Sequence, residues 1–242
     1  MTIRTTHPMA KTLRLFGTCA LFALTGCFTL ARPTPPLEEY VLGQGPRVAA
    51  APARNSGGVT IGLRRLDLAP YLATTAIVVR RGSRVVTSGF RRWGEEPSAG
   101  IMRTVAASLG GALTIAAVDV APWPVQAQHD YLIQLHVSHL EGVAAEELMA
   151  TEGEVHVMAS WEIIRSPDGT LVARGETDRR ETGWKVGDYL GLVTRVDKGL
   201  TGLASDLAAC LVRLASATPA SAAASTAPVV ATDARPVVCN VR

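Results

Sequence analysis

The chain has 242 residues, of which 48% are hydrophobic, and it carries 24 Lys and Arg against 21 Asp and Glu. Residues 1–26 hold three of the basic residues and none of the acidic ones, so the rest of the chain has 21 of each and is formally neutral. Because the chain after residue 26 is neutral and has no basic run, its charge gives no indication of nucleic-acid binding. The remaining length fits one domain with flexible ends.

The N-terminus has the pattern of an export signal. Three basic residues, Arg4, Lys11 and Arg14, precede a short apolar run over 15–24. That run has about half of the roughly 20 residues that a membrane-spanning helix needs. Residues 1–26 are therefore expected to be a cleaved signal peptide.

The signal ends in Leu24-Thr25-Gly26-Cys27, which resembles the lipobox of bacterial lipoproteins. The resemblance implies cleavage between Gly26 and Cys27, acylation of the Cys27 thiol with fatty chains such as palmitate, and attachment to a membrane. Phe28, where an Asp would retain the protein in the inner membrane, favours the outer membrane. A plain cleaved signal and an ordinary buried cysteine are the alternatives.

Composition predicts flexible segments on both sides of one domain. Residues 27–57 are rich in Pro and Ala and are expected to form a tether, with a strand-like island at Glu39-Tyr40-Val41-Leu42. Residues 217–242 are Ala, Ser, Thr and Pro with few large apolar groups, as in a disordered tail. The folded domain is expected over 58–216.

Hydrophobic periodicity in that span changes between two and about 3.6 residues. The Gly82-Ser83 pair predicts a hairpin, Pro97 opens an amphipathic helix, and Pro167-Asp168-Gly169 predicts a turn. Expected strands cover 59–63, 77–79, 85–90, 115–120, 131–140, 155–163 and 171–177, and expected helices begin at 97 and 188. The fold class is α/β (α+β-like), with one mixed, largely antiparallel sheet and two main helices packed on it.

The last helix, over about 188–215, repeats apolar residues every seven positions. Such a repeat is compatible with a coiled coil. A helix lying on the sheet is favoured, because Gly199 and Gly202 weaken a free helix.

Two cysteines remain to pair with each other once Cys19 leaves with the signal and Cys27 is acylated. Cys210 and Cys239 could form a disulfide in an oxidising compartment. A disordered tail and a core-facing Cys210 argue for two free thiols instead.

Residues for catalysis are sparse. His136 and His156 fall on the polar faces of neighbouring strands and could pair across them, but no third ligand stands at metal-binding spacing, so two solvated imidazoles are the simpler interpretation. The adjacent carboxylates Glu95-Glu96 and Glu146-Glu147 do not face one another, and no phosphate loop or nucleophile elbow is found. The sequence predicts a binding or scaffolding domain with no catalytic residue, metal or cofactor.

Three segments resemble the ABC-type transport auxiliary lipoproteins, the PqiC-like partners of mammalian-cell-entry (MCE) domain proteins. They are Ile61-Gly62-Leu63-Arg64-Arg65-Leu66-Asp67-Leu68-Ala69-Pro70-Tyr71-Leu72, Ile77-Val78-Val79-Arg80, and Phe90-Arg91-Arg92-Trp93-Gly94-Glu95-Glu96-Pro97. The Tyr40-Val41-Leu42 island, Pro122-Trp123 and the Tyr131 strand fit the same family.

The resemblance implies an α/β domain anchored to the outer membrane and facing the periplasm. It further implies a non-catalytic docking subunit that helps to move lipid or another hydrophobic substrate. Its partners would be an MCE-domain protein with an inner-membrane permease and an ATPase, and homo-oligomerisation stays open. A structural lipoprotein that binds peptidoglycan or a secretion complex is the alternative, and a periplasmic hydrolase is a third hypothesis without a nominated residue.

Four residues are candidates for contacts with a partner, because aromatic residues and Arg are enriched at interface cores. They are Tyr71, Arg91, Trp93 and Trp123. For Trp93 and Trp123, packing in the core or against a loop is the competing interpretation.

Overall fold

The computed structural model describes residues 34–43, 58–112, 114–147, 149–217 and 235–239. The chain divides into two units, Met1–Pro36 and Leu37–Arg242, and the sheet and helices below belong to the second. The signal peptide, the lipobox and Cys27 lie outside the described residues.

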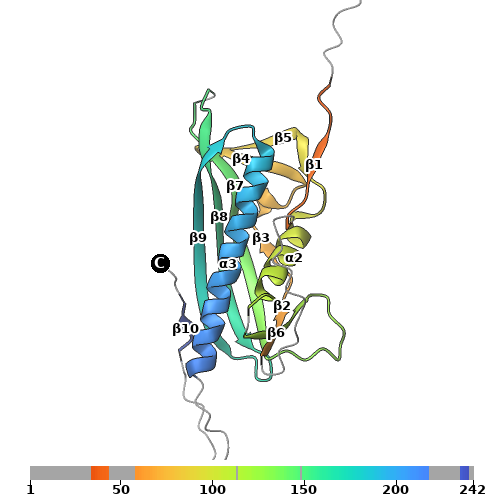
Figure 1. Ribbon diagram of the computed structural model, residues 1–242, viewed down its shortest axis with the longest axis vertical. Coiled ribbons are helices and arrows are strands. Elements are labelled where there is room, and N and C mark those ends of the chain that lie inside the picture. The colour runs from red at the N-terminus through yellow and green to blue at the C-terminus, as the bar shows by residue number, and fades with distance from the viewer. Residues whose placement is uncertain (1–33, 44–57, 113, 148, 218–234, 240–242) are drawn as a thin grey trace, which may run out of the picture. The chain divides into compact units, whose positions relative to one another are not determined.

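A ten-stranded mixed sheet forms this second unit, in the order β1-β5-β4-β7-β8-β9-β10 (Figure 1). Off this path β2 pairs with β6 and β7, and β3 pairs with β7. The strands are β1 Glu38–Tyr40, β2 Val59–Leu63, β3 Asp67–Leu68, β4 Ala76–Arg81, β5 Arg84–Trp93, β6 Ile115–Val120, β7 Tyr131–Ala144, β8 Glu152–Arg165, β9 Leu171–Lys185 and β10 Val237–Val238. The helices are η1 Pro70–Leu72 (a 3₁₀ turn), α2 Pro97–Leu109 and α3 Tyr189–Ala217. The predicted α/β fold is confirmed.

The longest ladders are antiparallel and join β7 to β8 and β8 to β9. Alternation along β7 places Ile133, Leu135 and Val137 fully inside. The residues between them face the other side of the sheet, as the period of two requires. Gly169, in the turn between β8 and β9, has a φ of 68°, which explains the glycine at the end of the Pro-Asp-Gly turn.

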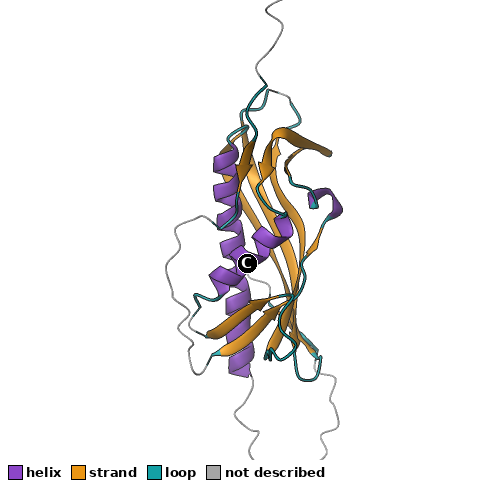
Figure 2. Ribbon diagram, turned by 90° about the vertical axis from the view of Figure 1, so that its right-hand side faces the viewer, coloured by secondary structure: helices purple, strands orange, loops and turns teal. Residues whose placement is uncertain are grey.

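Both main helices lie on one face of the sheet (Figure 2). The side of α3 that carries Val196, Leu200, Leu203 and Leu207 is completely buried. Gly199 faces β8, where a Cβ would come within 2.6 Å of Val157, so the glycine allows a close approach of helix and strand. The helix therefore lies on the sheet, as the sequence favours, and does not form a coiled coil. By length and composition α3 could cross a membrane, but its buried face identifies it as a core helix.

The sheet begins earlier than the predicted domain boundary at residue 58. Strand β1 pairs in parallel with the end of β5, with Tyr40 beside Trp93. Leu42, just after β1, is buried in the core. The strand-like island predicted at 39–42 is therefore confirmed as β1, and about ten residues of sequence lead from Cys27 to Leu37, where this unit begins.

The C-terminal segment also differs from the prediction of one disordered tail over 217–242. Strand β10 pairs in parallel with β9, and Val237 lies beside Ala173. The structure joins Cys239 to Cys210 in a disulfide with a Cα–Cα distance of 5.7 Å, and both cysteines are fully buried. A core-facing Cys210 is compatible with the bridge because residues 235–239 return to cover it.

Candidate functional site

The four predicted contact residues have different surroundings. Trp93 is only 6% exposed and belongs to the core, which favours the core-packing interpretation over a partner contact; it pairs with Tyr40 of β1 at the edge of the sheet. Trp123 is partly exposed and packs edge-on against His129, with ring centroids 4.8 Å apart. That contact fits the loop-packing interpretation.

Arg91 and Tyr71 each belong to a local network. Arg91 Nη2 donates to Glu38 at 3.3 Å, and its guanidinium lies 5.6 Å from the ring centroid of Tyr189. Tyr71, on η1, directs its hydroxyl toward Glu141 of β7. Arg91 thus remains a surface candidate, whereas the hydroxyl of Tyr71 is used inside the protein.

A bulge in β7 decides where the polar side chains of β7 and β8 lie. Val137 pairs with Ala159 but His139 pairs with Met158, which leaves Ser138 as an extra residue. Such a bulge exchanges the faces on which the following side chains lie. It falls where β7 passes from its neighbour β3 to its neighbour β4.

The predicted pairing of His136 with His156 is wrong, because the register of the ladder places their partners apart: the residue opposite His136 lies four positions beyond His156 on β8. His136 lies opposite Ser160 and is hydrogen-bonded to Asp67 at 2.8 Å, beside an open depression of about 380 Å³. His156 lies opposite Glu141 and is 2% exposed. One imidazole is therefore solvated, as expected, and the other is buried.

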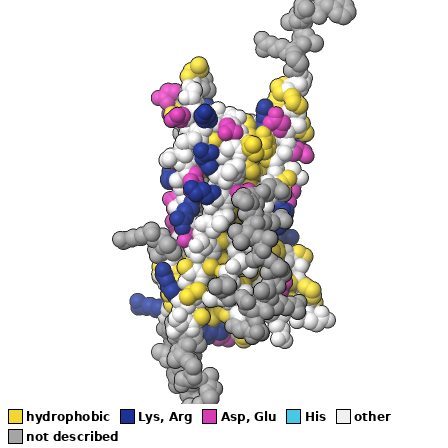
Figure 3. Space-filling view, in the orientation of Figure 1, with side chains coloured by type: hydrophobic (Ala, Val, Ile, Leu, Met, Phe, Trp, Pro, Cys, Tyr) yellow, Lys and Arg dark blue, Asp and Glu magenta, His cyan; other side chains and the backbone are white. Residues whose placement is uncertain are grey.

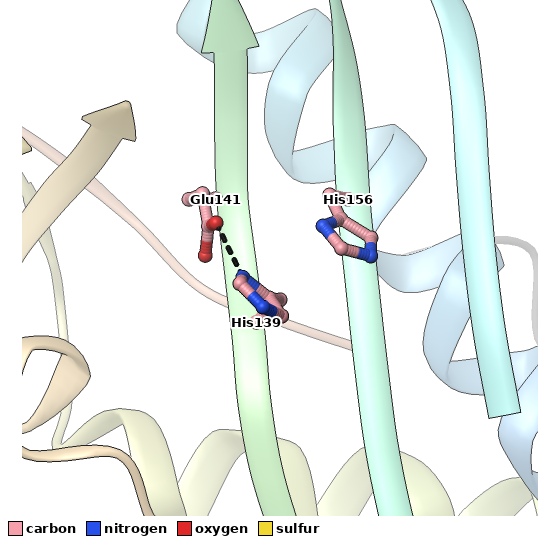
Figure 4. A group of neighbouring side chains, drawn as sticks. All are labelled: His139, Glu141 and His156. Carbon is pink, nitrogen blue, oxygen red and sulfur yellow. Dashed lines mark hydrogen bonds and ion pairs between the residues drawn. The ribbon is translucent and has the colours of Figure 1, made fainter. Parts of the chain in front are cut away.

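Beyond the bulge, polar side chains gather into a group that we call the Glu141 cluster. Its members are Tyr71, Arg80, His139, Glu141 and His156. Figure 4 shows His139 pointing at the Glu141 carboxylate from one strand and His156 beside it on the next. The two imidazoles are stacked, with centroids 4.4 Å apart and planes inclined by 19°. A short helical turn, η1, covers this face of the sheet, the one away from α3 (Figure 2).

Glu141 is the centre of the cluster and its side chain is completely buried. Oε1 accepts from His139 Nδ1 at 2.8 Å and from Arg80 Nε at 3.1 Å. Oε2 accepts from the Tyr71 hydroxyl and from the backbone N–H of Leu140, both at 2.9 Å. Burial by itself would raise the pKa of Glu141, but the hydrogen bonds from these four donors together lower it. Glu141 is thus an ionised carboxylate, and His139 must donate through Nδ1–H.

His156 has one nitrogen in use and one without a partner. Its Nε2 lies 2.9 Å from Asp178 of β9, while its buried Nδ1 has no hydrogen-bond partner among the described residues. Burial lowers the pKa of His156, the charge of Arg180 lowers it further, and Asp178 opposes this in part. The pKa of the Tyr71 hydroxyl is raised, by its burial and by the negative charge of Glu141.

Three members of the cluster are metal-ligand types: His139, Glu141 and His156 have ligand atoms within 4.8 Å of one another. Their geometry is unsuitable for one ion. Imidazole lone pairs lie in the ring plane, so two nearly parallel stacked rings cannot both aim at one point. Arg80 also adds a positive charge to the same carboxylate. The cluster is instead a hydrogen-bonded ion pair in which Glu141 of β7 accepts from Arg80 of β4 and from Tyr71 of η1, so it connects these elements.

The structure accounts for the remaining histidine as well. His129 is 7% exposed and lies 2.9 Å from Asp119. Within the described residues, all four histidines pair with a carboxylate, and none is hydrogen-bonded to a serine, threonine or cysteine side chain. In the part of the chain that the structure describes, the hydroxyl beside a histidine is that of Tyr71, 3.3 Å from His139 Nδ1, and it is already hydrogen-bonded to Glu141.

A model of the family described as "ABC-type transport auxiliary lipoprotein component" matches residues 40–208. The chain belongs to this family. The resemblance noted in the sequence is thereby confirmed, and the match begins at Tyr40 of β1 rather than at the predicted boundary.

Solved structures share the fold of this auxiliary lipoprotein. Protein XCC0632 from Xanthomonas campestris, of family DUF330, is 15% identical with a TM-score of 0.57, and the match covers 77% of this chain and 97% of that one. A second, uncharacterised protein is 17% identical with a TM-score of 0.56, covering 73% and 99%. At these identities the likeness shows the fold alone. A search of curated proteins gave no match.

Sequence reasoning missed the Glu141 cluster of the auxiliary lipoprotein. The available signal was Ser138-His139 followed by Glu141, which breaks the alternation of β7 with polar residues on both faces. A buried strand that carries such a break is where a bulge is expected.

Proposed function

We propose that this auxiliary lipoprotein is anchored by acylated Cys27 to the outer membrane, faces the periplasm, and acts as a non-catalytic docking subunit of an ABC-type transport system. The observation that carries the proposal is the family match over 40–208, next to a lipobox with Phe28 after the cysteine. The partners are an MCE-domain protein with its permease and ATPase, and the cargo is a lipid or another hydrophobic molecule.

The polar groups of the domain support a docking role over catalysis. The one buried carboxylate of the Glu141 cluster is held by four donors, so it is a poor general base. Among the described residues the histidine dyads have no hydrogen-bonded serine, threonine or cysteine side chain, and the hydroxyl beside His139 belongs to Tyr71, whose pKa is raised. A subunit of this kind would contribute surface and position, while the ATPase chain supplies the energy.

Envelope crosslinking tests the proposal. Cells expressing the full chain with a C-terminal tag are treated with a short crosslinker, and the captured proteins are identified after solubilisation in mild detergent. We expect an MCE-domain protein, and we expect the Cys27→Ser variant to lose it because the domain is no longer held at the membrane. Capture of peptidoglycan or secretion components with no MCE protein would favour the structural alternative.

Membrane fractionation tests the location separately. The full chain is expected to float with outer-membrane vesicles and to carry acyl chains on Cys27 by mass spectrometry. Recovery in the inner-membrane fraction would contradict the sorting inferred from Phe28.

A further inference from the structure

One end of the domain, which we call the hairpin end, exposes large apolar side chains. Its five residues are Leu37, Val85, Val86, Met149 and Leu190. Met149 is 88% exposed, Leu190 66% and Leu37 54%, and the two valines are nearly half exposed. Exposed apolar residues that gather in one region mark an interaction surface more often than scattered ones do.

These residues come from four segments that converge. In Figure 1 the β4–β5 hairpin, the β7–β8 hairpin, β1 and the first turn of α3 all lie at the upper end. Arg81 Nη1 joins the two hairpins by donating to the carbonyls of Ala145 and Glu147. Tyr40 of β1 and Tyr189 of α3 have ring centroids 6.4 Å apart. Figure 3 shows apolar side chains at the surface of this upper end.

The short link to the lipid favours contact between the bilayer and the part of the domain where the link is attached. Ten residues lead from Cys27 to Leu37, and a fully extended chain spans at most about 3.6 Å per residue, or roughly 35 Å. Leu37 belongs to the hairpin end itself. The other end of α3 lies farther along the helix, since its 29 residues extend for about 43 Å at 1.5 Å per residue.

We infer that the hairpin end docks onto the bilayer surface, with Met149, Leu190 and Leu37 inserted among the lipid head groups. The inference rests on the proposed acylation of Cys27. Exposed Leu and Met beside Tyr and Arg are the side chains that membrane interfaces accept, because apolar groups enter and the hydroxyl and guanidinium stay at the head groups. The two hairpin turns carry two basic residues, Arg81 and Arg84, and two acidic ones, Glu146 and Glu147, so charge does not favour binding and apolar burial is the main driving force. Docking would fix the orientation of the domain toward its periplasmic partner.

Lipid-attached quenchers test the docking. The acylated full-length protein carrying Met149→Cys is labelled with an environment-sensitive fluorophore and reconstituted into phosphatidylethanolamine–phosphatidylglycerol vesicles that contain nitroxide lipids. The matched control is Val212→Cys, which is 42% exposed on the same protein, about 33 Å along α3 from Leu190. We expect strong quenching at position 149 and little at 212.

A second pair of variants tests whether the quenching comes from docking of the domain or from the fluorophore alone. Leu190→Glu in the Met149→Cys protein should lower the docking equilibrium by about tenfold, since burying one Leu side chain is worth at least about 1.5 kcal/mol. Val212→Glu should leave quenching unchanged. Both substitutions are at exposed sites, and equal urea midpoints would show that folding is intact.

The outcomes distinguish this inference from the proposed function. Protein that floats with vesicles but shows equal quenching at 149 and 212, or none at 149, overturns the docking and leaves the anchor standing. A fluorophore shift at 149 that occurs in native envelopes and not in vesicles also overturns it, because a partner protein then covers the hairpin end. If Cys27 is not acylated, both the anchor and the docking are wrong.

Discussion

Glu141→Gln is the substitution that most directly tests the polar cluster. The carboxylate is completely buried and accepts four hydrogen bonds, two at each oxygen. A glutamine keeps the shape but places an NH₂ group where one oxygen was. In place of Oε1 this group meets the donors of His139 and Arg80; in place of Oε2 it meets the Leu140 N–H, while the Tyr71 hydroxyl keeps the Ser138 carbonyl at 2.8 Å as an acceptor. The charge that neutralises Arg80 is lost as well.

The expected cost follows from those contacts. A buried donor left without an acceptor costs about 1–3 kcal/mol, and breaking one side of a buried ion pair costs about 3–5 kcal/mol. The Arg80 side chain is 27% exposed, so water compensates part of its loss, and we expect about 3–4 kcal/mol of destabilisation. This is a large share of the stability of an ordinary domain.

Urea unfolding followed by tryptophan fluorescence measures the effect, using the mature chain with Cys27→Ser so that lipid does not complicate the transition. Glu162→Gln is the matched control, because Glu162 is an exposed carboxylate on the neighbouring strand and should change stability by less than about 0.5 kcal/mol. A loss below about 1 kcal/mol for Glu141→Gln, or equal losses for the two variants, would refute the role assigned to Glu141.

Three further outcomes are expected. The pKa of His156 is lower in the folded protein than in the unfolded chain, so on acidification the unfolded chain binds a proton first. The free energy of unfolding should therefore fall as the pH drops below about 6.5, by up to about 1.4 kcal/mol per pH unit, until the folded-state pKa is reached. Urea midpoints of His156→Gln should lack this dependence on pH. Cys239→Ser opens the disulfide, which spans 29 residues of sequence, and should cost about 3–4 kcal/mol, whereas an unchanged thermal midpoint would mean that the bridge does not constrain the unfolded chain. Gly142→Ala places a Cβ within 2.7 Å of the Trp184 ring and should cost about 1–3 kcal/mol by calorimetry, while Gly89→Ala, with nothing within 4 Å, should be nearly neutral.

The main fold could be predicted because its elements are long and carry clear periods. The sequence of β8 alternates over 155–163, most of its 14 residues, and α3 repeats its apolar residues along a 29-residue helix. By contrast β1 and β10 have three and two residues and pair in parallel with strands far away in sequence. Segments that short have no period, and the partner supplies most of what makes them strands. The island at 39–42 still marks β1 in the sequence, whereas β10 lies within the predicted tail without such a signal.

The Glu141 cluster could not be predicted from the alternation of β7, because one extra residue, Ser138, interrupts it. Up to Val137 the alternation of β7 is regular, and carrying it forward would put Leu140 and Gly142 on the outer face. The bulge at Ser138 turns these two residues toward α3 and gives His139 and Glu141 to the opposite face. Single-residue bulges depend on how neighbouring strands pair, and β7 changes partners at that point. The same shift places Glu141 opposite His156 on β8.

The two features assigned here are joined through adjacent residues of β4. Arg80 turns to one side of the strand, where it donates to Glu141 and to the Gly82 carbonyl in the β4–β5 turn. Arg81 donates to the carbonyls of Ala145 and Glu147, which hold the β7–β8 hairpin that carries Met149. The Glu141 cluster thus connects β4 to β7, and Arg81, the next residue of β4, connects the β4–β5 hairpin to the β7–β8 hairpin. A domain built to dock needs a rigid support beneath its contact residues, because a loosely held surface loses conformational entropy on binding. We interpret the buried ion pair between Arg80 and Glu141 as that support.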